Sequence, residues 1–532
     1  MDTKALRQKI LDLAVRGKLV PQAPDDEPAS MLLERIRAEK QQMVKEGKLK
    51  AKDIKKDTII FRGDDNLHYE KFADGSVKCI EDEIPFEVPE GWVWCRIATV
   101  CSILTDGTHK TPTYSDKGYI FLSSKNVTRG VIDWDNIMHI PESLHNELYV
   151  RLAPHLNDIL LAKNGTTGVA ALVDRECVFD IYVSLALMRI VKEIILPQYV
   201  LNVIESSYVQ DYFNNSLKGI GVPNLHLEHI RNTLIPVSPY QEQLRIVEKL
   251  NKIIPLLNQI QHDKYIIIQL STKVKSKLLD LAIRGKLVPQ DPDDEPASVL
   301  LERIRSEKDG LIELGKIKRD KKESIIFRGD DSSYYEKIDN HVYKIDNECQ
   351  PALPNGWEYA RLKSICTKIV DGSHNPPKGQ NHKTEYLMMS SRNINDNTFI
   401  DLDNVRYLSK TEFEKENERT LIAFNDILLT TVGSLGRSCI YQKNPLNLCF
   451  QRSVTVISTL ILPQYLKLYF DSPCFQRFMN DNANGTAQKG FYLNQLENVI
   501  IPVPPISEQH TLVSCVEELM RRLNQIYLEV RS

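Results

Sequence analysis

Two kinds of hydrophobic pattern alternate along the 532-residue chain, and each predicts a different structure. From Tyr240 to about Arg284, apolar residues occupy the a and d positions of a heptad, with Lys264 and Ser271 as polar interruptions. This spacing is typical of a long helix that packs against another helix, although an ordinary core helix shows the same periodicity. At about 1.5 Å per residue such a helix is roughly 65 Å long. The apolar positions are Ile246, Leu250, Ile253, Leu257, Ile260, Ile267, Val274, Leu278 and Leu281.

The second pattern consists of short apolar runs separated by Gly, Asn and Asp, and it fills residues 79–239 and 349–505. Such runs between turn residues are typical of β-strands. Short helices are expected after the LPQY sequences at 196–199 and 462–465, so each range predicts a mixed α/β domain. The predicted strands are 119–122, 158–161 and 183–190 in the first domain and 385–389, 426–429 and 453–457 in the second, and each domain closes on an apolar strand with a proline-rich exit, at 234–239 and 500–505.

The arrangement occurs twice in the chain. Residues 10–40 and 278–308 are identical at 26 of 31 positions. The sequence IIFRGDD at 59–65 returns at 325–331, and the Gly-Trp pair at 91–92 returns at 356–357. A molecule built from two copies of one unit presents two copies of one surface, which predicts that it binds a two-part partner.

The duplication is also circular. Residues 506–532 match 240–266, and residues 1 onward match 269 onward, so the second copy of the long helix is divided between the two chain ends. We expect these ends to meet and rebuild a second long helix. The fold predicted is therefore α+β, with two mixed α/β domains separated by a pair of long antiparallel, coiled-coil-like helices in a circular pseudo-twofold repeat. The matching apolar positions are Leu512, Val516, Leu519, Leu523, Ile526, Val530, Leu6, Ile10 and Leu13.

Five parts follow from these patterns, and the chain is long enough for two separate cores. They are an N-terminal helical region at 1–78, a globular domain at 79–239, the long helix with a repeat of the N-terminal region at 240–348, a second globular domain at 349–505 and a C-terminal helix at 506–532.

Composition limits the partners and the compartment. With 68 basic and 71 acidic residues the net charge is -3, so a DNA-binding surface would have to be a local patch. The ten cysteines include no CxxC pair, which favours reduced thiols over a metal site. Without a signal sequence or an 18-residue apolar run, a cytoplasmic protein that does not enter a membrane is expected.

Three loops occur in both copies and are the candidates for binding. They are 105–109 with 370–374, 123–126 with 390–393, and 165–168 with 433–436. Because a shared loop belongs either to the scaffold or to the shared task, residues in and beside these loops are the predicted DNA-binding set. This set is Thr108, His109, Lys110, Lys125, Asn126, Lys163, Asn164, Thr166, Thr167, Ser373, His374, Asn375, Lys378, Arg392, Asn393, Thr431, Ser434, Arg437 and Lys489.

The residue types in these loops suit a nucleic acid, although exposed turns would look the same. A cation beside asparagine, as in Lys125-Asn126 and Arg392-Asn393, can reach guanine or phosphate while the amide pairs with adenine. The Gly-x-x-Gly loops allow backbone N–H groups to approach phosphate, but they lack the lysine of a P-loop. The lysine-rich segments 45–56 and 316–322 could lie on phosphate or simply be solvated.

Catalytic interpretations find little support. His109 and His374 could each be a base, a metal ligand or a phosphate contact, but no Ser, Cys or second His recurs at a fixed spacing. The sequence Asn375-Pro-Pro-Lys378 resembles the Asn-Pro-Pro-aromatic site of adenine methyltransferases, yet lysine replaces the ring that would stack on a flipped base. A structural or DNA-contacting role for both histidines is favoured, and no metal ligands are predicted.

Taken in order, these features resemble the specificity subunit of type I restriction-modification systems over essentially the whole chain. The features are the circular duplication, the RGKLVPQ and EPAS blocks, the DGTH and DGSH loops, the NDILL strands and the proline-rich exits that end in Glu-Gln. No single motif is decisive, but their order, repeated twice, is specific. The long N-terminal helix with its lysine-rich segment departs from some members of the family.

The resemblance implies a division of labour. Residues 79–239 and 349–505 would be target recognition domains that each read one half of a split site in double-stranded DNA. The paired helices, through Leu250, Leu257, Leu278, Leu519 and Leu523, would dock two methyltransferase subunits, which recruit the restriction subunits. The chain itself would be non-catalytic and bind no cofactor, with S-adenosylmethionine, ATP and magnesium held by its partners. Two other hypotheses remain: a methyltransferase or nuclease with an unrecognised active site, and a coiled-coil adaptor that binds no DNA.

Overall fold

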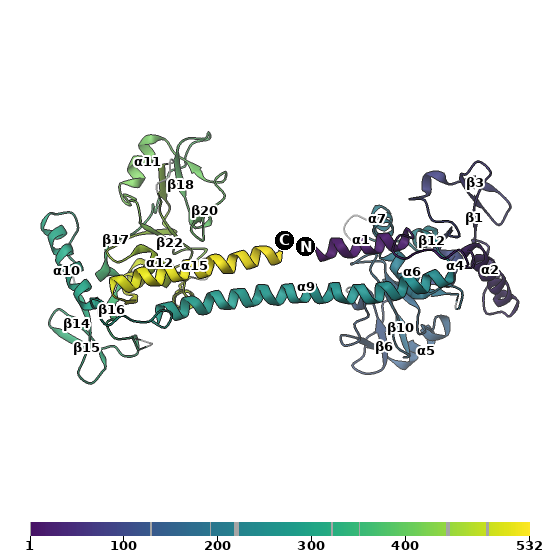
Figure 1. Ribbon diagram of the computed structural model, residues 1–532, viewed down its shortest axis with the longest axis horizontal. Coiled ribbons are helices and arrows are strands. Elements are labelled where there is room, and N and C mark those ends of the chain that lie inside the picture. Colours follow the sequence, from purple (N-terminus) through teal and green to yellow (C-terminus); the bar gives the residue numbers. More distant parts are fainter. Residues whose placement is uncertain are drawn as a thin grey trace. The chain divides into compact units, whose positions relative to one another are not determined.

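The computed structural model describes residues 2–127, 130–191, 193–217, 223–320, 323–349, 352–442, 447–485 and 489–531. The chain divides into two compact units, Met1–Asp263 and Lys264–Ser532 (Figure 1). Each unit has its own large hydrophobic core, centred on Leu161 and Met188 in unit 1 and on Leu429 and Ile457 in unit 2. The expected meeting of Met1 and Ser532 lies outside the described residues.

Unit 1 contains the first copy of the repeat. Its helices are α1 (Thr3–Val15), α2 (Ala29–Lys45), α3 (Ala51–Ile54), α4 (Ile97–Val100), α5 (Glu142–Arg151), α6 (Pro197–Ile204), α7 (Ser207–Asn215) and α8 (Leu227–Asn232). Its strands are β1 (Ile59–Arg62), β2 (His68–Lys71), β3 (Val77–Cys79), β4 (Val93–Arg96), β5 (Cys101–Asp106), β6 (Tyr119–Leu122), β7 (Met138–Ile140), β8 (Ile159–Ala162), β9 (Ala170–Leu172), β10 (Phe179–Ile181), β11 (Leu185–Ile190) and β12 (Leu234–Val237).

The helix α9 (Tyr240–Ile283) begins in unit 1 and ends in unit 2, which contains the second copy. The further helices are α10 (Ala297–Glu313), α11 (Lys410–Asn417), α12 (Pro463–Asp471), α13 (Pro473–Asp481), α14 (Leu493–Glu497) and α15 (Ile506–Arg531). The further strands are β13 (Ser324–Arg328), β14 (Tyr334–Ile338), β15 (His341–Lys344), β16 (Glu358–Arg361), β17 (Cys366–Asp371), β18 (Tyr386–Met389), β19 (Ile394–Asn395), β20 (Thr398–Phe399), β21 (Arg406–Tyr407), β22 (Ile427–Thr430), β23 (Ser438–Ile440), β24 (Asn447–Phe450), β25 (Val454–Thr459) and β26 (Ile500–Val503).

Four sheets of each unit share their topology, whereas the two-stranded sheet β19-β20 belongs, among the described residues, to unit 2 alone. An antiparallel sheet of order β5-β11-β8-β9 in unit 1 corresponds to β17-β25-β22-β23 in unit 2. Beside it, β10-β6-β7 corresponds to β24-β18-β21, and in each of these sheets the first pair is parallel and the second antiparallel. The predicted strands and the helices after LPQY are confirmed, because β6, β8, β11, α6 and their partners all form. The mixed α+β repeat predicted from the sequence is therefore the observed fold.

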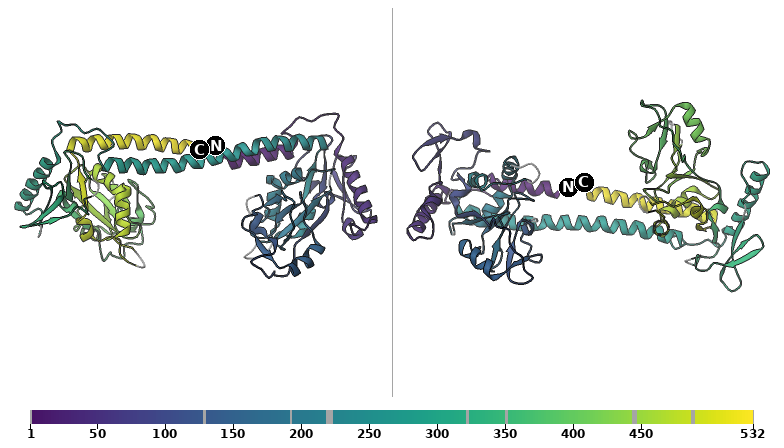
Figure 2. Two further views of the ribbon diagram at one scale, coloured as in Figure 1. Left: turned by 90° about the horizontal axis from the view of Figure 1, so that it is seen from below. Right: turned by 180° about the vertical axis from the view of Figure 1, so that it is seen from behind.

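Within each unit, α9 packs against a second, antiparallel helix. In unit 1 this helix is α1 (Figure 2). Its Thr3 hydroxyl donates to the Gln261 side chain. In unit 2 it is α15, where the Lys275 ammonium lies 5.9 Å from the centre of the Tyr527 ring and donates to Asn524. The periodicity of 240–284 was therefore that of a helix with a helical neighbour, as predicted.

The glutamine of the repeated RGKLVPQ sequence and the tryptophan of the Gly-Trp pair meet in each unit in a hydrogen-bond cluster around a buried glutamate. In unit 1, the Trp92 indole donates to Glu242 Oε2 at 2.8 Å, and the Gln22 amide donates to Glu242 Oε1 at 3.0 Å. The carboxylate thus ties the loop after α1 and the start of β4 to the first turn of α9. Trp357, Gln290 and Glu508 form the same cluster in unit 2.

Two bulk expectations can be compared with the structure. All ten cysteines are free thiols, and burial raises the pKa of Cys101 to about 12, which keeps this thiol protonated. Over the described ranges, no helix has the length and apolar character needed to cross a bilayer.

Candidate nucleic-acid interface

A short turn between β10 and β11 holds the first predicted loop of unit 1 in place. The Thr108 N–H donates to the Ile181 carbonyl at 3.1 Å, and the Val183 N–H donates to the Thr108 carbonyl at 3.0 Å. These reciprocal bonds fix the first loop. A Cβ on Gly107 would lie 2.1 Å from the Ile181 carbonyl oxygen, so only glycine allows this close approach.

Ser184, at the end of the same turn, holds the other two loops. Its hydroxyl oxygen accepts the Ser124 N–H at 3.0 Å, and its carbonyl accepts the Lys163 N–H at 2.8 Å. Residues 106–110, 123–126 and 163–168 are thereby brought together around the turn 181–184. We refer to these residues, and to their counterparts in unit 2, as the three-loop cluster.

Unit 2 repeats this arrangement bond for bond. The Ser373 N–H donates to the Phe450 carbonyl at 2.8 Å, and the Arg452 N–H donates to the Ser373 carbonyl at 2.9 Å. Ser453 accepts the Ser391 N–H on its hydroxyl and the Thr431 N–H on its carbonyl, both at 3.0 Å. The cluster of unit 2 is therefore 371–375, 390–393 and 431–436, arranged around the turn 450–453.

Sequence reasoning missed the two turns. Ser184 and Ser453 were included only as the beginnings of predicted strands, although serine stands at the matched position in both copies. That recurrence was the available signal. Arg452 belongs to the same turn, is exposed, and makes no side-chain hydrogen bond or ion pair within the described part of the chain.

Ten of the predicted DNA-binding residues expose their side chains. In unit 1, Lys110 forms an ion pair with Glu147 at 2.8 Å between exposed groups, which solvent weakens. The full exposed set is His109, Lys110, Lys125, Thr166, His374, Asn375, Lys378, Arg392, Arg437 and Lys489. These residues give each cluster a cationic, polar surface that is suited to a phosphate backbone or to base edges.

The two predicted asparagines have a different role from the expected one. Asn126 is buried, and its Oδ1 accepts the Ser123 N–H at 2.9 Å while its Nδ2 donates to the Asp133 and Asn136 carbonyls. Asn393 does the same in unit 2 with Ser390, Ile400 and Asp401. Because both amides are already hydrogen-bonded inside the loop, we correct the expectation that they pair with adenine. They hold Lys125 and Arg392 in position instead.

Four other predicted residues are also buried. Lys163 donates to Asp106 Oδ2 at 2.6 Å between two buried side chains, so its charge is already paired. Thr431 shares a hydrogen bond of 3.1 Å with Thr455. Thr108 and Ser373 are buried beneath their loops. These four side chains are buried and support the loops of the cluster, so they cannot contact a base.

Three more predicted residues are half-buried. Asn164 pairs through its backbone with Asn224, and the Thr167 hydroxyl lies 3.4 Å from the carbonyls of Lys163 and Gly165. The carbonyl of Ser434 accepts the Thr430 hydroxyl. The contacts of Thr167 and Ser434 are local, whereas Asn164 joins the third loop of unit 1 to Asn224.

The two histidines each lie against an aspartate of their own loop. His109 Nε2 is 3.3 Å from Asp106 Oδ1, and His374 Nε2 is 2.7 Å from Asp371 Oδ2. Asp371 also accepts from Arg419 at 2.5 Å, which supplies in unit 2 the cation that Lys163 supplies in unit 1. Among the described residues, neither histidine makes a hydrogen bond with a serine, threonine or cysteine side chain, so the geometry favours a positioning or DNA-contacting role.

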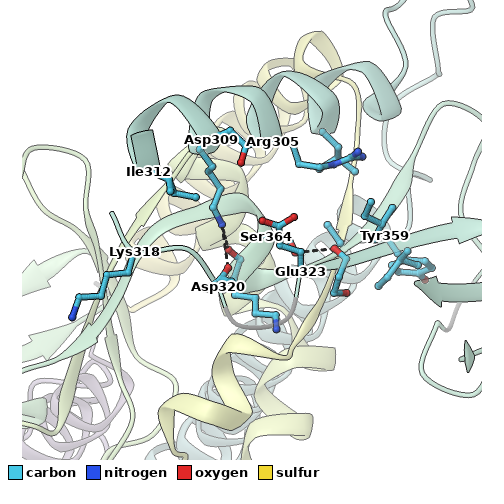
Figure 3. A pocket seen from close by; sticks show the side chains of 15 residues that line it. Arg305, Asp309, Ile312, Lys318, Asp320, Glu323, Tyr359 and Ser364 are labelled. Carbon is cyan, nitrogen blue, oxygen red and sulfur yellow. Dashed lines mark hydrogen bonds and ion pairs between the residues drawn. The ribbon is translucent and has the colours of Figure 1, made fainter. Parts of the chain in front are cut away.

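The lysine-rich segments line polar hollows away from the three-loop clusters. A cavity of about 100 Å³ in unit 2 lies between α10 and the loop that carries Asp320 and Glu323 (Figure 3). Its Lys308 ammonium is 3.7 Å from Asp320 and donates to the Lys363 carbonyl at 2.7 Å. Cations and carboxylates are mixed here, so phosphate contact by residues 316–322 stays a prediction. Lys321 and Lys322 lie outside the described residues.

The predicted docking leucines are placed differently from one another. Leu250 and Leu278 belong to the hydrophobic cores of their units, and Leu257 is also buried, so these three side chains cannot meet a partner. Leu519 and Leu523 are half-buried. The apolar residues that α9 and α15 expose are instead Leu244, Leu256, Ile260, Tyr265, Ile266, Ile267, Leu270, Val274, Ile526 and Leu528.

Comparison with known proteins relates this architecture to one family. The model of the type I restriction modification DNA specificity domain matches residues 89–270 and 354–529, which is more than half of the chain. The EcoEI specificity subunit of Escherichia coli is 26% identical over 99% of this chain and 91% of its own length. The EcoAI specificity subunit of the same species is 26% identical over 98% and 90%.

A solved structure shares the fold. It was described in work on complex assembly and conformational transition of the type I R-M system, and it covers 84% of this chain and 94% of its own. Its TM-score is 0.52 at 16% sequence identity. At this identity the likeness concerns the fold alone.

Proposed function

This chain belongs to the type I restriction-modification DNA specificity family, and from that premise we propose that it reads a bipartite DNA site with its two three-loop clusters. In this proposal residues 79–239 and 349–505 are the two target recognition domains. Each contributes one half of the recognised sequence, and the chain directs the methyltransferase and restriction subunits of its complex to that site.

The observation that supports the proposal best is the recurrence of one loop cluster on two independent units. In both, a turn that ends in serine holds three loops by hydrogen bonds to their backbone groups, and the loop tips expose Lys125 or Arg392. The scaffold is the same and the tips differ, as expected of two domains that read different bases at matched positions. Lys110 is replaced by Asn375, and Asn164 by Val432.

Two domains are needed for energetic reasons. Each base pair read correctly contributes about 1–3 kcal/mol of discrimination, so one small domain cannot single out a site in a genome. Two tethered domains add their contributions at a high effective concentration. Half-sites about 34 Å apart, one helical turn, would present both halves on one face of the duplex.

Catalysis in this proposal belongs to partner subunits. The histidines of the clusters are paired with aspartates of their own loops, an arrangement that orients a ring without providing a nucleophile. S-adenosylmethionine, ATP and magnesium would be bound by the partners. Two methyltransferase subunits would dock on α9 and α15, where exposed Tyr265, Leu270 and Leu528 offer apolar contact area.

The purified full-length chain, with and without its methyltransferase subunit, tests this function. The chain alone should neither cleave DNA nor transfer methyl groups, and the assembled complex should bind DNA with an affinity that falls steeply as salt rises, because phosphate contacts release counterions. Methyl transfer or cleavage by the chain alone would favour an enzyme. Salt-independent binding, or none, would favour an adaptor without a DNA surface.

A further inference from the structure

The surface beside the three-loop cluster has different residue types in the two units, at positions that match in the repeat. In unit 2, a hollow of about 320 Å³ opens beside β18, β21 and the turn 450–453. Its polar lining includes Lys378, Arg392, Arg406 and Gln451, and no carboxylate belongs to its described lining residues. A hollow with three cations and no acid is electropositive, which suits the negative edge of a nucleic acid base or a phosphate.

Some lining side chains are held in place, while others are left to meet a ligand. The Arg406 guanidinium donates to the Pro377 carbonyl at 2.6 Å, which fixes the floor of the hollow. By contrast, Lys378, Arg392 and Gln451 make no side-chain hydrogen bond or ion pair with the described residues. Their donors and acceptors therefore face the hollow or the solvent.

Strand register identifies the matching residues of unit 1. Met138 opposes Phe121 across β7 and β6, as Arg406 opposes Met388 across β21 and β18. Tyr182 donates its N–H to the Leu122 carbonyl at 2.9 Å, just as Gln451 donates to Met389 at 2.9 Å. Met138 therefore stands in the place of Arg406, and Tyr182 in the place of Gln451.

The matched surface of unit 1 is apolar and aromatic. The Phe121 ring lies 6.2 Å from Tyr114 and 6.1 Å from Tyr182, measured between ring centres. Tyr114 and Met138 are each about half exposed, at 47% and 49%. Unit 1 thus presents an apolar surface where unit 2 presents a cationic hollow that can form hydrogen bonds.

We propose that these matched surfaces read bases and make the two half-sites different. This inference rests on the DNA-binding function proposed above. The hollow of unit 2 takes the major-groove edge of a purine, where arginine pairs with guanine and glutamine with adenine. The surface of unit 1 contacts a thymine methyl group through Met138 and Tyr182, because apolar side chains are the natural partners of that methyl. Gln451 and Tyr182 are the specificity-determining residues.

The test uses the full-length chain assembled with its methyltransferase subunit. Methylated positions in the genome of a host that carries the complex give both half-sites, and duplexes with each base at each position give relative affinities. Gln451→Ala should reduce discrimination at one base pair of the half-site read by unit 2 by about 5- to 150-fold, and leave the other half-site unchanged. Gln451→Glu should shift that position toward cytosine, whose amino group a carboxylate accepts.

Two further variants complete the test: the equivalent substitution in unit 1 and a control outside the hollow. Tyr182→Ala should relax only the half-site read by unit 1. Lys383→Ala removes an exposed cation that pairs with Asp403 at 3.1 Å outside the lining of the hollow, and it should change neither half-site. Thermal unfolding of each variant shows that the fold is kept, and the half-site that does not change reports that the complex still works.

Three outcomes would overturn the inference. If Gln451→Ala and Gln451→Glu both weaken binding to every duplex equally, the hollow binds phosphate. If neither variant changes either half-site, base reading lies elsewhere, and a change in both half-sites would show that the surfaces do not act separately. Loss of the proposed function itself is distinguishable, because the wild-type complex would then give no sequence-specific methylation.

Discussion

At the scale of single residues, the exposed tips and the buried supports of the three-loop clusters have separate tasks. Asn126 and Lys163 have the residue types of base readers, yet one satisfies backbone groups inside a loop and the other neutralises Asp106. Lys125, next to Asn126, is exposed. Substitution of a support should therefore affect folding, and substitution of a tip should affect DNA binding.

The pair Lys163 and Asp106 allows the first prediction. Lys163→Ala leaves the Asp106 carboxylate buried without its cation, which should cost about 3–5 kcal/mol in the free energy of unfolding. The matched control is Lys110→Ala, which breaks the exposed pair with Glu147 and should cost at most about 1 kcal/mol. Chemical denaturation measures both. Equal losses for the two variants would contradict the burial argument.

Asn126 and Lys125 give a second prediction. Asn126→Ala removes the hydrogen bonds of the amide to three backbone groups and leaves those groups unpaired, so unfolding should become easier by about 1–3 kcal/mol. Lys125→Ala should leave stability almost unchanged and weaken DNA binding by the complex. Denaturation and binding assays on both variants separate the roles, and the reverse outcome would restore Asn126 as a base reader.

At the scale of elements, the buried carboxylate at the start of α9 sets a pH dependence. Burial raises the pKa of Glu242 from 4.5, and the hydrogen bonds from Gln22 and Trp92 offset only part of this effect. A carboxyl whose pKa is raised on folding binds its proton more tightly in the folded state. Its contribution to stability is therefore present below pH 4.5 and is lost as the pH rises through the folded pKa.

Glu242→Gln should remove that dependence, because the amide oxygen can still accept from Trp92 without carrying a charge. The variant should be at least as stable as the wild type at pH 7, and its unfolding midpoint should fall less as the pH rises from 4.5. Glu508→Gln should repeat the result in unit 2. Glu248→Gln, at an exposed position of the same helix, is the control: pairing with Lys252 lowers the pKa of Glu248, so this variant should not reduce the fall of the unfolding midpoint as the pH rises.

The end of α1 gives another prediction for an element. Gly17 has φ +65°, and a Cβ there would lie 2.4 Å from Pro89 Cγ, whereas Gly47 has φ +71° with open space around it. Gly47→Ala should cost only the backbone strain, about 1–2 kcal/mol. Gly17→Ala adds a steric clash and should cost clearly more by chemical denaturation. Equal costs would show that Pro89 moves aside freely.

At the scale of the whole molecule, each unit contains a complete copy of the three-loop cluster and its own core. The family relationship and this internal independence predict modular recognition. Replacing residues 79–239 with the corresponding domain of another family member should change one half-site of the methylated sequence and leave the other intact. Sequencing of methylated positions checks this outcome, and a change in both halves would contradict it.

Periodicity and repetition were enough to predict the strands, the long helix with its neighbour and the twofold repeat. They could not assign Asn126, Lys163 or the buried leucines of α9, because burial depends on which distant segment closes over a side chain. The turn 181–184 was missed for the same reason, since its bonds to loops about 20 to 75 residues earlier have no local signature. Lys110, Lys125 and Arg392 are exposed, and their contact with DNA stays a prediction.

The serine turn has a consequence for how such proteins change over evolutionary time. The turn is hydrogen-bonded to the three loops mostly through main-chain atoms, which every amino acid has. Mutations at the exposed tips of the loops can therefore accumulate without breaking the hydrogen bonds between the turn and the loops. One recognition domain could therefore change the half-site that it reads while the other half-site stays the same. The same short turn allows the recognised sequence to vary and keeps the fold stable.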